Sequence, residues 1–496
     1  MKAIMVVGTT SHAGKSSLVT ALCRLLWRNG WLVTPFKGQN MALNAYVTAT
    51  GGEMGYAQAL QAWGAKVVPR VEMNPILLKP QGNMTSQVIM KGEVVGVTNA
   101  KEYYQNYFEK GWEVITESLE TLAQEFDLVV CEGAGSPAEI NLKHRDLTNM
   151  RVAKHLNADT ILVADIERGG VFAHIVGTLE LLDPEERSLI KGIVINKFRG
   201  DKTILDPGIE WLENYTNIPV LGVIPWFDSA LPSEDSLGLL DRSSRKKVYE
   251  LKINVIKLPH ISNFTDFDPL EAEDSVLIEY IEPNGKLGYP DAVIIPGTKT
   301  TIADLKILEK TGMMSQIREY VESGGTILGI CGGFQMLGNK ILDPEHLEGL
   351  EENCQGLDLL PIKTILKQEK ITRQREVSAN YPQQGLPVDG YEIHQGYTEM
   401  IPFLVKQRKI RYLPLFDDET LGIVNEIQSV WGCYLHGIFD NGAWRRAWLN
   451  SLRQKRGLPS LPTGISNYRQ QREELLDSLA DLVEKHLNLE SFFHNF

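Results

Sequence analysis

The residues that most constrain the fold of this chain form a glycine-rich loop near its start, in MVVGTTSHAGKSS, residues 5–17. An apolar run precedes the loop and apolar residues at helical spacing follow it, which predicts a strand, a turn and a helix. Turn N–H groups, a lysine and a helix start together bind phosphate. Five residues separate Gly8 from Gly14, one more than in the common pattern, but every physical element is present. We therefore expect a nucleotide site.

Strand-like runs and helical patterns alternate along most of the chain. The runs are KAIMVV, WLVTPFK, DLVVCEG, DTILVADI, KGIVINKF and PVLGVIP in the first half, and KINVIKLP, SVLIEYIE, DAVIIPG, GTILGIC and SVWGCYLHG in the second. This alternation is typical of α/β folds in which helices cover both faces of a mostly parallel sheet. A polar, turn-rich stretch near residues 232–250 separates the two sets.

The chain is therefore expected to contain two α/β domains. We expect a phosphate-loop domain over residues 1–235, a linker over 236–250, a second α/β domain over 251–445 and a helical extension over 446–496. Leucines at helical spacing in the extension are better explained by a helix packed on the core of this chain than by a partner-binding helix.

Composition excludes several classes of protein. A formal net charge of −13 argues against broad binding to nucleic acid or to an anionic membrane surface. No apolar run is long enough to span a bilayer. The five cysteines are far apart and form no Cys-x-x-Cys pair, so a disulfide framework or zinc site is not expected and a reducing cytoplasm fits. The sequence leaves a homo-oligomer open.

Polar residues at the strand ends around the loop are further candidates for binding a metal ion or the substrate. Ser16 would place its hydroxyl on Mg²⁺, and Glu132, at the end of DLVVCEG, is the second candidate metal ligand. Basic residues near these strand ends, Lys37 among them, suggest an acidic substrate. The candidate residues of the loop itself are Gly8, Thr9, Gly14, Lys15, Ser16 and Ser17.

A second site is predicted in GTILGICGGFQMLG, residues 325–338. A strand, a glycine-rich turn around Cys331 and a helix form the pattern of a nucleophile elbow. The helix start favours the thiolate form of the cysteine. A cysteine nucleophile needs a base. His436 in WGCYLHGIFD is preferred to His394 in GYEIHQG, which has Glu392 nearby, because a strand end can project His436 over the elbow.

The cysteine motif Cys-x-Gly-x-Gln resembles class I glutamine amidotransferases. The resemblance implies that Cys331 attacks the amide of glutamine, forms a glutamyl thioester and releases ammonia, with His436 as the base. The class usually has Pro and Glu after this histidine, whereas Gly437 and Ile438 follow it here. That departure matches the subclass in cobyrinate-amidating enzymes, which carries a GYEIH-like segment. The implied oxyanion and glutamine-binding residues are Gly297, Gly332 and Gln335.

The first half of the chain resembles the same family. The long spacing of its loop resembles that of dethiobiotin synthetase and related ATP-dependent enzymes. FKGQNMALN, MNPILLKP, EGAGSPAEINL, VADIERGGVFAHIVGT and INKFRGD are similar to segments of cobyric acid synthases, and the resemblance extends to about residue 445. It places Asn196 against the adenine of ATP and makes Lys37, Lys143 and Arg145 the candidates that hold substrate carboxylates. Relatives often carry an acid before Gly51, where this chain has Thr50, so Glu53 is a weaker metal candidate.

The resemblance also implies a reaction. With Mg²⁺ bound, ATP phosphorylates the b, d, e and g carboxylates of adenosylcobyrinic acid a,c-diamide, a corrinoid of cobalamin biosynthesis. Ammonia from Cys331 travels internally and displaces each phosphate, which gives adenosylcobyric acid.

Three alternatives remain at this point. The acceptor could be the substrate of cobyrinic acid a,c-diamide synthase or another polycarboxylate, although FKGQNMALN and MNPILLKP favour the first assignment. A partitioning-type switch ATPase has a similar loop but needs neither a cysteine elbow nor a second domain. An inactive glutaminase domain is suggested by the missing carboxylate after His436.

Overall fold

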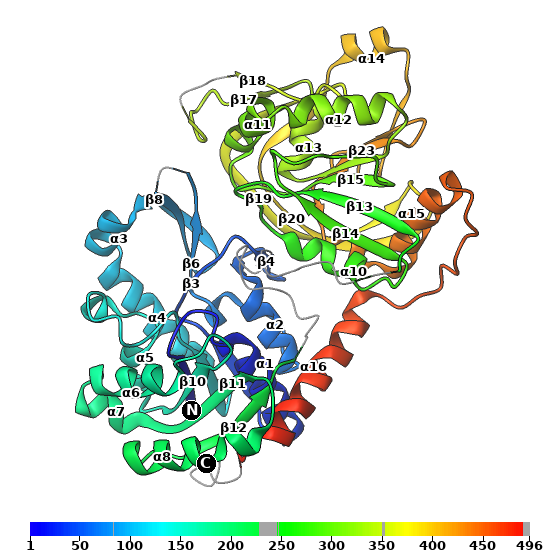
Figure 1. The fold of residues 1–496 in the computed structure, drawn as a ribbon. Coiled ribbons are helices and arrows are strands. Elements are labelled where there is room, and N and C mark those ends of the chain that lie inside the picture. Colours follow the sequence, from blue (N-terminus) through cyan, green and yellow to red (C-terminus); the bar gives the residue numbers. More distant parts are fainter. Residues whose placement is uncertain (83, 228–245, 247, 350–352, 490–496) are drawn as a thin grey trace.

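The computed structural model describes residues 1–82, 84–227, 246, 248–349 and 353–489. Two α/β domains lie side by side, and a long helix at the end of the chain runs from the second back along the first (Figure 1). The two-domain α/β fold predicted from the alternation is confirmed. Most of the expected linker, residues 236–245 and 247, lies outside the described residues.

The first domain is built on a six-stranded parallel sheet in the order β12-β11-β10-β1-β9-β2. Buried Ile4 and Val6 of β1 face one side with α1, and buried Met5 and Val7 face the other side. The strands are β1 (Lys2–Gly8), β2 (Val33–Phe36), β9 (Leu128–Glu132), β10 (Asp159–Asp165), β11 (Ile190–Phe198) and β12 (Val220–Pro225). The helices are α1 (Lys15–Arg28), α2 (Tyr56–Gly64), α3 (Ala100–Asn106), α4 (Phe108–Ala123), α5 (Met150–Leu156), α6 (Val171–Leu181), α7 (Pro184–Leu189) and α8 (Asp206–Thr216).

An insertion between β2 and β9 reaches toward the second domain (Figure 1). It contains a four-stranded sheet, β3-β6-β7-β8, and the hairpin β4-β5. The backbone carbonyl of Ala45 accepts a hydrogen bond from Asn263 at 3.0 Å, and Asn44 accepts one from the backbone N–H of Phe264 at 3.0 Å. These contacts join the domains. The strands are β3 (Gln39–Met41), β4 (Ala45–Val47), β5 (Glu53–Gly55), β6 (Ile76–Pro80), β7 (Thr85–Met90) and β8 (Glu93–Asn99).

The second domain contains a seven-stranded sheet, β14-β13-β15-β16-β23-β22-β21, and a five-stranded sheet, β18-β17-β19-β20-β24. In this seven-stranded sheet the five neighbours β14, β13, β15, β16 and β23 are parallel, so their carboxyl ends lie at one edge of the sheet. The strands are β13 (Leu251–Ile256), β14 (Val276–Ile281), β15 (Ala292–Ile295), β16 (Ile327–Ile330), β17 (Lys340–Leu342), β18 (Asn353–Gln355), β19 (Ile362–Ala379), β20 (Leu386–Met400), β21 (Tyr412–Pro414), β22 (Gly422–Asn425), β23 (Val430–Cys433) and β24 (Leu435–His436). The helices are α10 (Asp268–Glu271), α11 (Thr301–Lys310), α12 (Met313–Glu322), α13 (Gly332–Leu337), α14 (Pro402–Arg408) and α15 (Gly442–Lys455).

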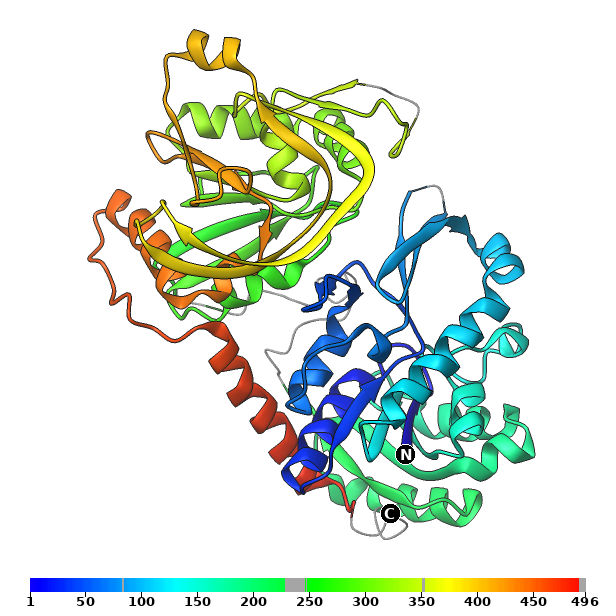
Figure 2. The ribbon, with the colours of Figure 1, turned by 180° about the vertical axis from the view of Figure 1, so that it is seen from behind.

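The last helix, α16 (Tyr468–His486), packs on the first domain (Figure 2). Its Leu479, Ala480 and Val483 are buried in the core that α1 covers. Arg28 of α1 also contacts Asp481 at 2.6 Å. Beyond the helix, the N–H of Asn488 donates to the carbonyl of Leu221 in edge strand β12 at 2.8 Å. None of the helices in the described part of the chain has the length and apolar character needed to cross a bilayer.

Candidate functional site

The phosphate-type loop joins β1 to α1. Gly14 has φ of 99°, and a Cβ there would lie 2.0 Å from the Asn196 side chain, so only glycine fits. The Lys15 ammonium donates to the carbonyls of Thr10 at 3.1 Å and Gly135 at 3.0 Å. Asn196 donates to the carbonyl of Ala13 at 2.9 Å, so it lies directly against the loop. Of the other candidates, Gly8 ends β1, Thr9 is buried directly after it, and Ser16 and Ser17 lie in the first turn of α1.

A polar cluster lies at the start of α1. The Glu132 carboxylate, 1% exposed at the end of β9, accepts from the Ser16 hydroxyl at 2.9 Å and from the Lys37 ammonium at 2.8 Å. Its second oxygen accepts from Gln61 of α2, a residue that the sequence pattern did not indicate. The adjacent hydroxyl and carboxylate oxygens are the ligand types that Mg²⁺ prefers, so this pair fits a metal beside the loop.

The remaining basic candidates lie apart from these contacts. The Lys143 ammonium forms ion pairs with Asp183 at 2.9 Å and Glu186 at 2.7 Å. The Arg145 guanidinium lies 4.8 Å from the centre of the Tyr104 ring. Of the three predicted substrate contacts, the structure therefore brings only Lys37 to the Glu132 cluster.

Glu53 does not fit the metal site for which it was the weaker candidate. Its carboxylate accepts from Lys79 at 2.8 Å and also pairs with Lys370 of the second domain. Both of its oxygens are thereby engaged by ammonium groups at the junction between the domains.

Cys331 lies in a sharp turn between β16 and α13. Its φ of 53° and ψ of −112° form a strained conformation that typically costs about 1–3 kcal/mol. Gly329 and Gly333 make the turn possible, because a Cβ on Gly333 would lie 2.0 Å from the carbonyl of Ile295 and one on Gly329 would lie 2.4 Å from the carbonyl of Gly333. The strand, the strained turn and the helix have the form of a nucleophile elbow.

His436 lies beside Cys331 and is held by a carboxylate from a distant segment. Its Nδ1 is 2.6 Å from Asp266, and the second oxygen of Asp266 accepts from the backbone N–H of Gly437 at 2.8 Å. The two side chains are 1% and 3% exposed. Cys331 lines the same pocket as His436, and its Sγ donates to the carbonyl of Ile393 at 3.4 Å. Asp266 therefore supplies the orienting carboxylate that is missing after the histidine.

The electrostatics of this triad favour catalysis by the cysteine. Burial alone would lower the pKa of His436, but Asp266 and Cys331 together raise it to about 10. A protonated imidazole beside Sγ stabilises the thiolate, which is the nucleophilic form. Asp266 follows β13 in the short helix Phe264–Phe267, so it lies at the same sheet edge as Cys331 after β16 and His436 after β23.

Asp266→Asn is expected to reduce glutamine hydrolysis by at least about 100-fold, because an amide neither holds the Nδ1–H tautomer nor stabilises the imidazolium. Glutamate release by the full-length variant measures this effect. Asp268→Asn, on the next buried acid, is the control and should stay near wild type. Equal rates for Asp266→Asn and wild type would remove Asp266 from the triad.

Gln335 and Gly332 line the pocket beside Cys331, and Gly297 lies next to His436. Gln335 accepts from Thr301 at 3.2 Å and donates to the carbonyl of Gln395 at 3.1 Å, so its amide forms part of the wall. Added Cβ atoms on Gly297 and Gly332 would lie 3.2 Å from His436 and 2.7 Å from Thr298, respectively. Gly332 therefore leaves no room for a side chain against Thr298, and Gly297 packs closely against His436.

His394, the rival base, lines the same pocket but has different partners. Its Nδ1 faces the carbonyl of Gly396 at 3.2 Å, and its ring stacks on Tyr434. Glu392 lies 3.9 Å from its Nε2 and pairs with Arg373. The geometry favours His436 as the base.

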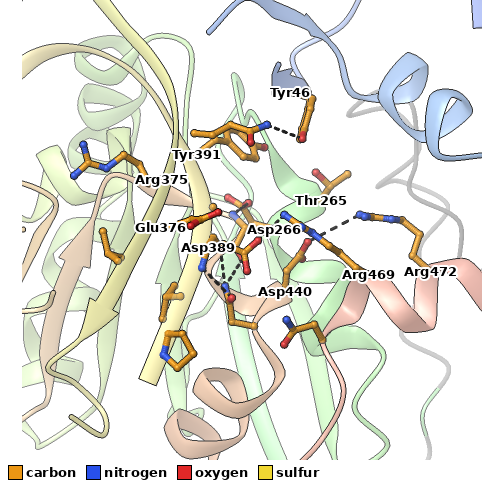
Figure 3. Close-up of a pocket in the computed structure, with 18 of the residues that line it drawn as sticks. Tyr46, Thr265, Asp266, Arg375, Glu376, Asp389, Tyr391, Asp440, Arg469 and Arg472 are labelled. Carbon is orange, nitrogen blue, oxygen red and sulfur yellow. Dashed lines mark hydrogen bonds and ion pairs between the residues drawn. The ribbon is translucent and has the colours of Figure 1, made fainter. Parts of the chain in front are cut away.

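A larger cavity of about 610 Å³ borders Asp266 (Figure 3). Tyr46 reaches it from the first domain, Tyr391 from β20, and Arg469 and Arg472 from α16. Burial raises the pKa of Asp440 in this cavity to about 6. The carboxylate of the triad therefore lies where both domains and the last helix meet.

Comparisons with known proteins agree with this two-part site. A CobQ/CobB/MinD/ParA nucleotide binding domain matches residues 4–237, and a CobB/CobQ-like glutamine amidotransferase domain matches residues 252–444. A cobyric acid synthase of Rippkaea orientalis is 68% identical over 493 residues, which cover 99% of this chain and 100% of that protein. Cobyric acid synthases of a Nostoc species and a Synechocystis species are 67% and 66% identical, each over 99% of this chain and over 99% and 97% of their own lengths.

Proposed function

This chain belongs to the cobyric acid synthase family of glutamine-dependent ligases, and on that premise we propose that it amidates the b, d, e and g carboxylates of adenosylcobyrinic acid a,c-diamide to give adenosylcobyric acid. ATP activates each carboxylate and glutamine supplies the nitrogen. The observation that supports the proposal is the presence of two candidate sites in one chain: Cys331 with the paired His436 and Asp266, and a phosphate-type loop with an adjacent hydroxyl and carboxylate.

Ammonia is generated at the triad. The Cys331 thiolate attacks the side-chain carbonyl carbon of glutamine, and His436 gives its proton to the departing nitrogen, so that ammonia leaves and a thioester remains. His436 then takes a proton from water, whose oxygen displaces the thiolate and releases glutamate. Gly332 and Gly297 shape the space around the transient oxyanion.

Amide formation occurs at the phosphate loop. A substrate carboxylate oxygen attacks the γ-phosphorus of ATP and ADP leaves. Ammonia then attacks the acyl carbon of the acyl phosphate, and inorganic phosphate departs as the amide forms. Loop N–H groups and Lys15 stabilise the transferred charge. Ser16 and Glu132 would hold Mg²⁺, which neutralises phosphate charge when bound. Lys37, already beside Glu132, would position the substrate carboxylate, and Asn196 would lie against the nucleotide.

The alternatives differ in their support. The full-length similarity to cobyric acid synthases disfavours a partitioning-type switch ATPase. Asp266 removes the reason for suspecting an inactive glutaminase, since it pairs with His436 at 2.6 Å. A different polycarboxylate acceptor is the remaining competitor. All five cysteines are buried as thiols rather than joined in disulfides, which supports action in a reducing compartment such as the cytoplasm.

Mass spectrometry of adenosylcobyrinic acid a,c-diamide incubated with the protein, ATP, Mg²⁺ and glutamine tests the proposal. Four stepwise replacements of a carboxyl OH by NH₂, with one glutamate released per step, are expected. An unchanged corrinoid together with ATP-stimulated glutamine hydrolysis would keep the ligase chemistry and exclude this acceptor.

A further inference from the structure

Three lysines from both domains gather in the pocket that contains Cys331. Lys79 lies on β6 of the first domain, Lys299 lies between β15 and α11, and Lys370 lies on β19. We refer to Lys79, Lys299 and Lys370 as the lysine cluster. The lysine cluster and His436 line the same pocket. A molecule whose amide group reaches Cys331 in this pocket would therefore lie close to the lysine cluster.

The carboxylates near the lysine cluster do not fully balance its charge. Glu53, 1% exposed on β5, pairs with Lys79 at 2.8 Å and with Lys370. Glu348, which accepts from the backbone N–H of Ile302 at 2.7 Å, is the second carboxylate that acts on Lys299. Three lysines therefore share these two carboxylates, and the side chain of Cys331 is a further group that acts on Lys370.

The pKa values show the effect of this imbalance. Burial and the charges of Lys370 and Lys79 lower the pKa of Lys299 to about 7. Although burial opposes the change, Lys370 and Lys79 lower the pKa of Glu53 to about 2. The lowered pKa of Lys299 reflects the crowding of positive charge, and an anion bound at the lysine cluster would favour its charged form again.

Glutamine carries such an anion at the end opposite its amide. Its α-carboxylate matches the lysine cluster, and its α-ammonium matches a carboxylate such as Glu348. We propose that the lysine cluster binds the α-carboxylate of glutamine, with Lys79 supplied by the ligase domain, so that the glutamine pocket is complete only when the two domains are docked. This inference rests on the proposed glutaminase activity of Cys331.

The consequence is a coupling between the two halves of the enzyme. Lys79 lies in the inserted sheet whose neighbour β4 contacts the second domain through Ala45. A shift of this insertion would move Lys79 and weaken the binding of glutamine without any change at Cys331. Glutamine hydrolysis would therefore depend on how the ligase domain is positioned.

The rate of alkylation of Cys331 tests whether the lysine cluster binds the α-carboxylate of glutamine. The measurement needs neither an acceptor substrate nor ATP. The diazoketone 6-diazo-5-oxo-L-norleucine has the α-carboxylate and α-ammonium of glutamine, whereas iodoacetamide has neither. In full-length Lys79→Met, we expect half-saturation by the diazoketone to need about 10- to 100-fold more reagent, with the iodoacetamide rate unchanged. Glu53 and Lys370 remain as a balanced pair in this variant, which favours retention of the fold.

Lys91→Met is the matched control, because Lys91 belongs to the same inserted sheet region but pairs with exposed Glu117 at 2.7 Å. Lys299→Met should behave like Lys79→Met. Unchanged half-saturation in both cluster variants, or an equal loss of iodoacetamide reactivity, would overturn the inference. Failure of the wild type to react selectively at Cys331 would instead overturn the proposed glutaminase site.

Discussion

Cys331→Ala is expected to abolish glutamine-dependent amidation, by at least about 10⁴-fold, while amidation with added ammonium salts stays within about threefold of wild type. Without the thiol, no thioester forms and no ammonia is released from glutamine. The ligase site is untouched, because Cys331 lies in the elbow of the second domain, whereas Lys15 and Glu132 belong to the first. External ammonia can therefore still open the acyl phosphate.

Corrinoid amidation measured with each nitrogen source in turn provides the test. Cys354→Ala is the control, since Cys354 is buried on β18 away from the elbow turn and should leave both activities intact. Loss of both activities in a correctly folded Cys331→Ala protein would mean that the two sites do not work as a relay.

Lys15→Ala is expected to remove amidation with glutamine and with ammonium alike, by at least about 100-fold. The variant takes away the one ammonium group that the loop itself carries, and the transferred phosphoryl charge loses that stabilisation. The structure places the Lys15 ammonium within the loop, 3.1 Å from the carbonyl of Thr10.

ATP consumption and amide formation are the measurements for Lys15→Ala. Alkylation of Cys331 by the glutamine-like diazoketone should be retained and would show that the second domain is folded. ATP-dependent amidation at the wild-type rate in this variant would reject the phosphate-loop interpretation.

The parts of the site that the sequence predicted share a physical basis. Glu132 and Cys331 each follow an apolar run, and in a parallel sheet the carboxyl ends of neighbouring strands meet at one edge. Glycines that are sterically required, such as Gly14, mark the two turns. Strand ends and glycine spacing can be recognised locally, so these residues and the two-domain α/β fold could be predicted.

The parts that the sequence did not predict depend on contacts between distant segments. Asp266 reaches His436 across 170 residues, and its neighbourhood NFTDFDP has none of the glycines that mark the two turns. The one feature of the sequence that could have indicated Asp266 as a site residue is its position after the apolar run of β13. The long strands β19 and β20 carry many polar residues that are not fully buried, so they lack the alternation that marks a half-buried strand. Gln61 contacts Glu132 through a helix whose packing no short pattern specifies.

The docking of α16 also determines when the first domain can finish folding. Leu479 and Val483 fill the apolar face of α1, and the residues after the helix pair with edge strand β12, where a Cβ on Gly222 would lie 2.1 Å from the carbonyl of His486. A ribosome adds about 5–20 residues per second. The apolar face of α1 therefore stays exposed for roughly 10–50 s after β12 has emerged, until α16 is made and packs on it. The first domain is therefore completed only by α16, a helix that is synthesised after the whole of the second domain's sheets.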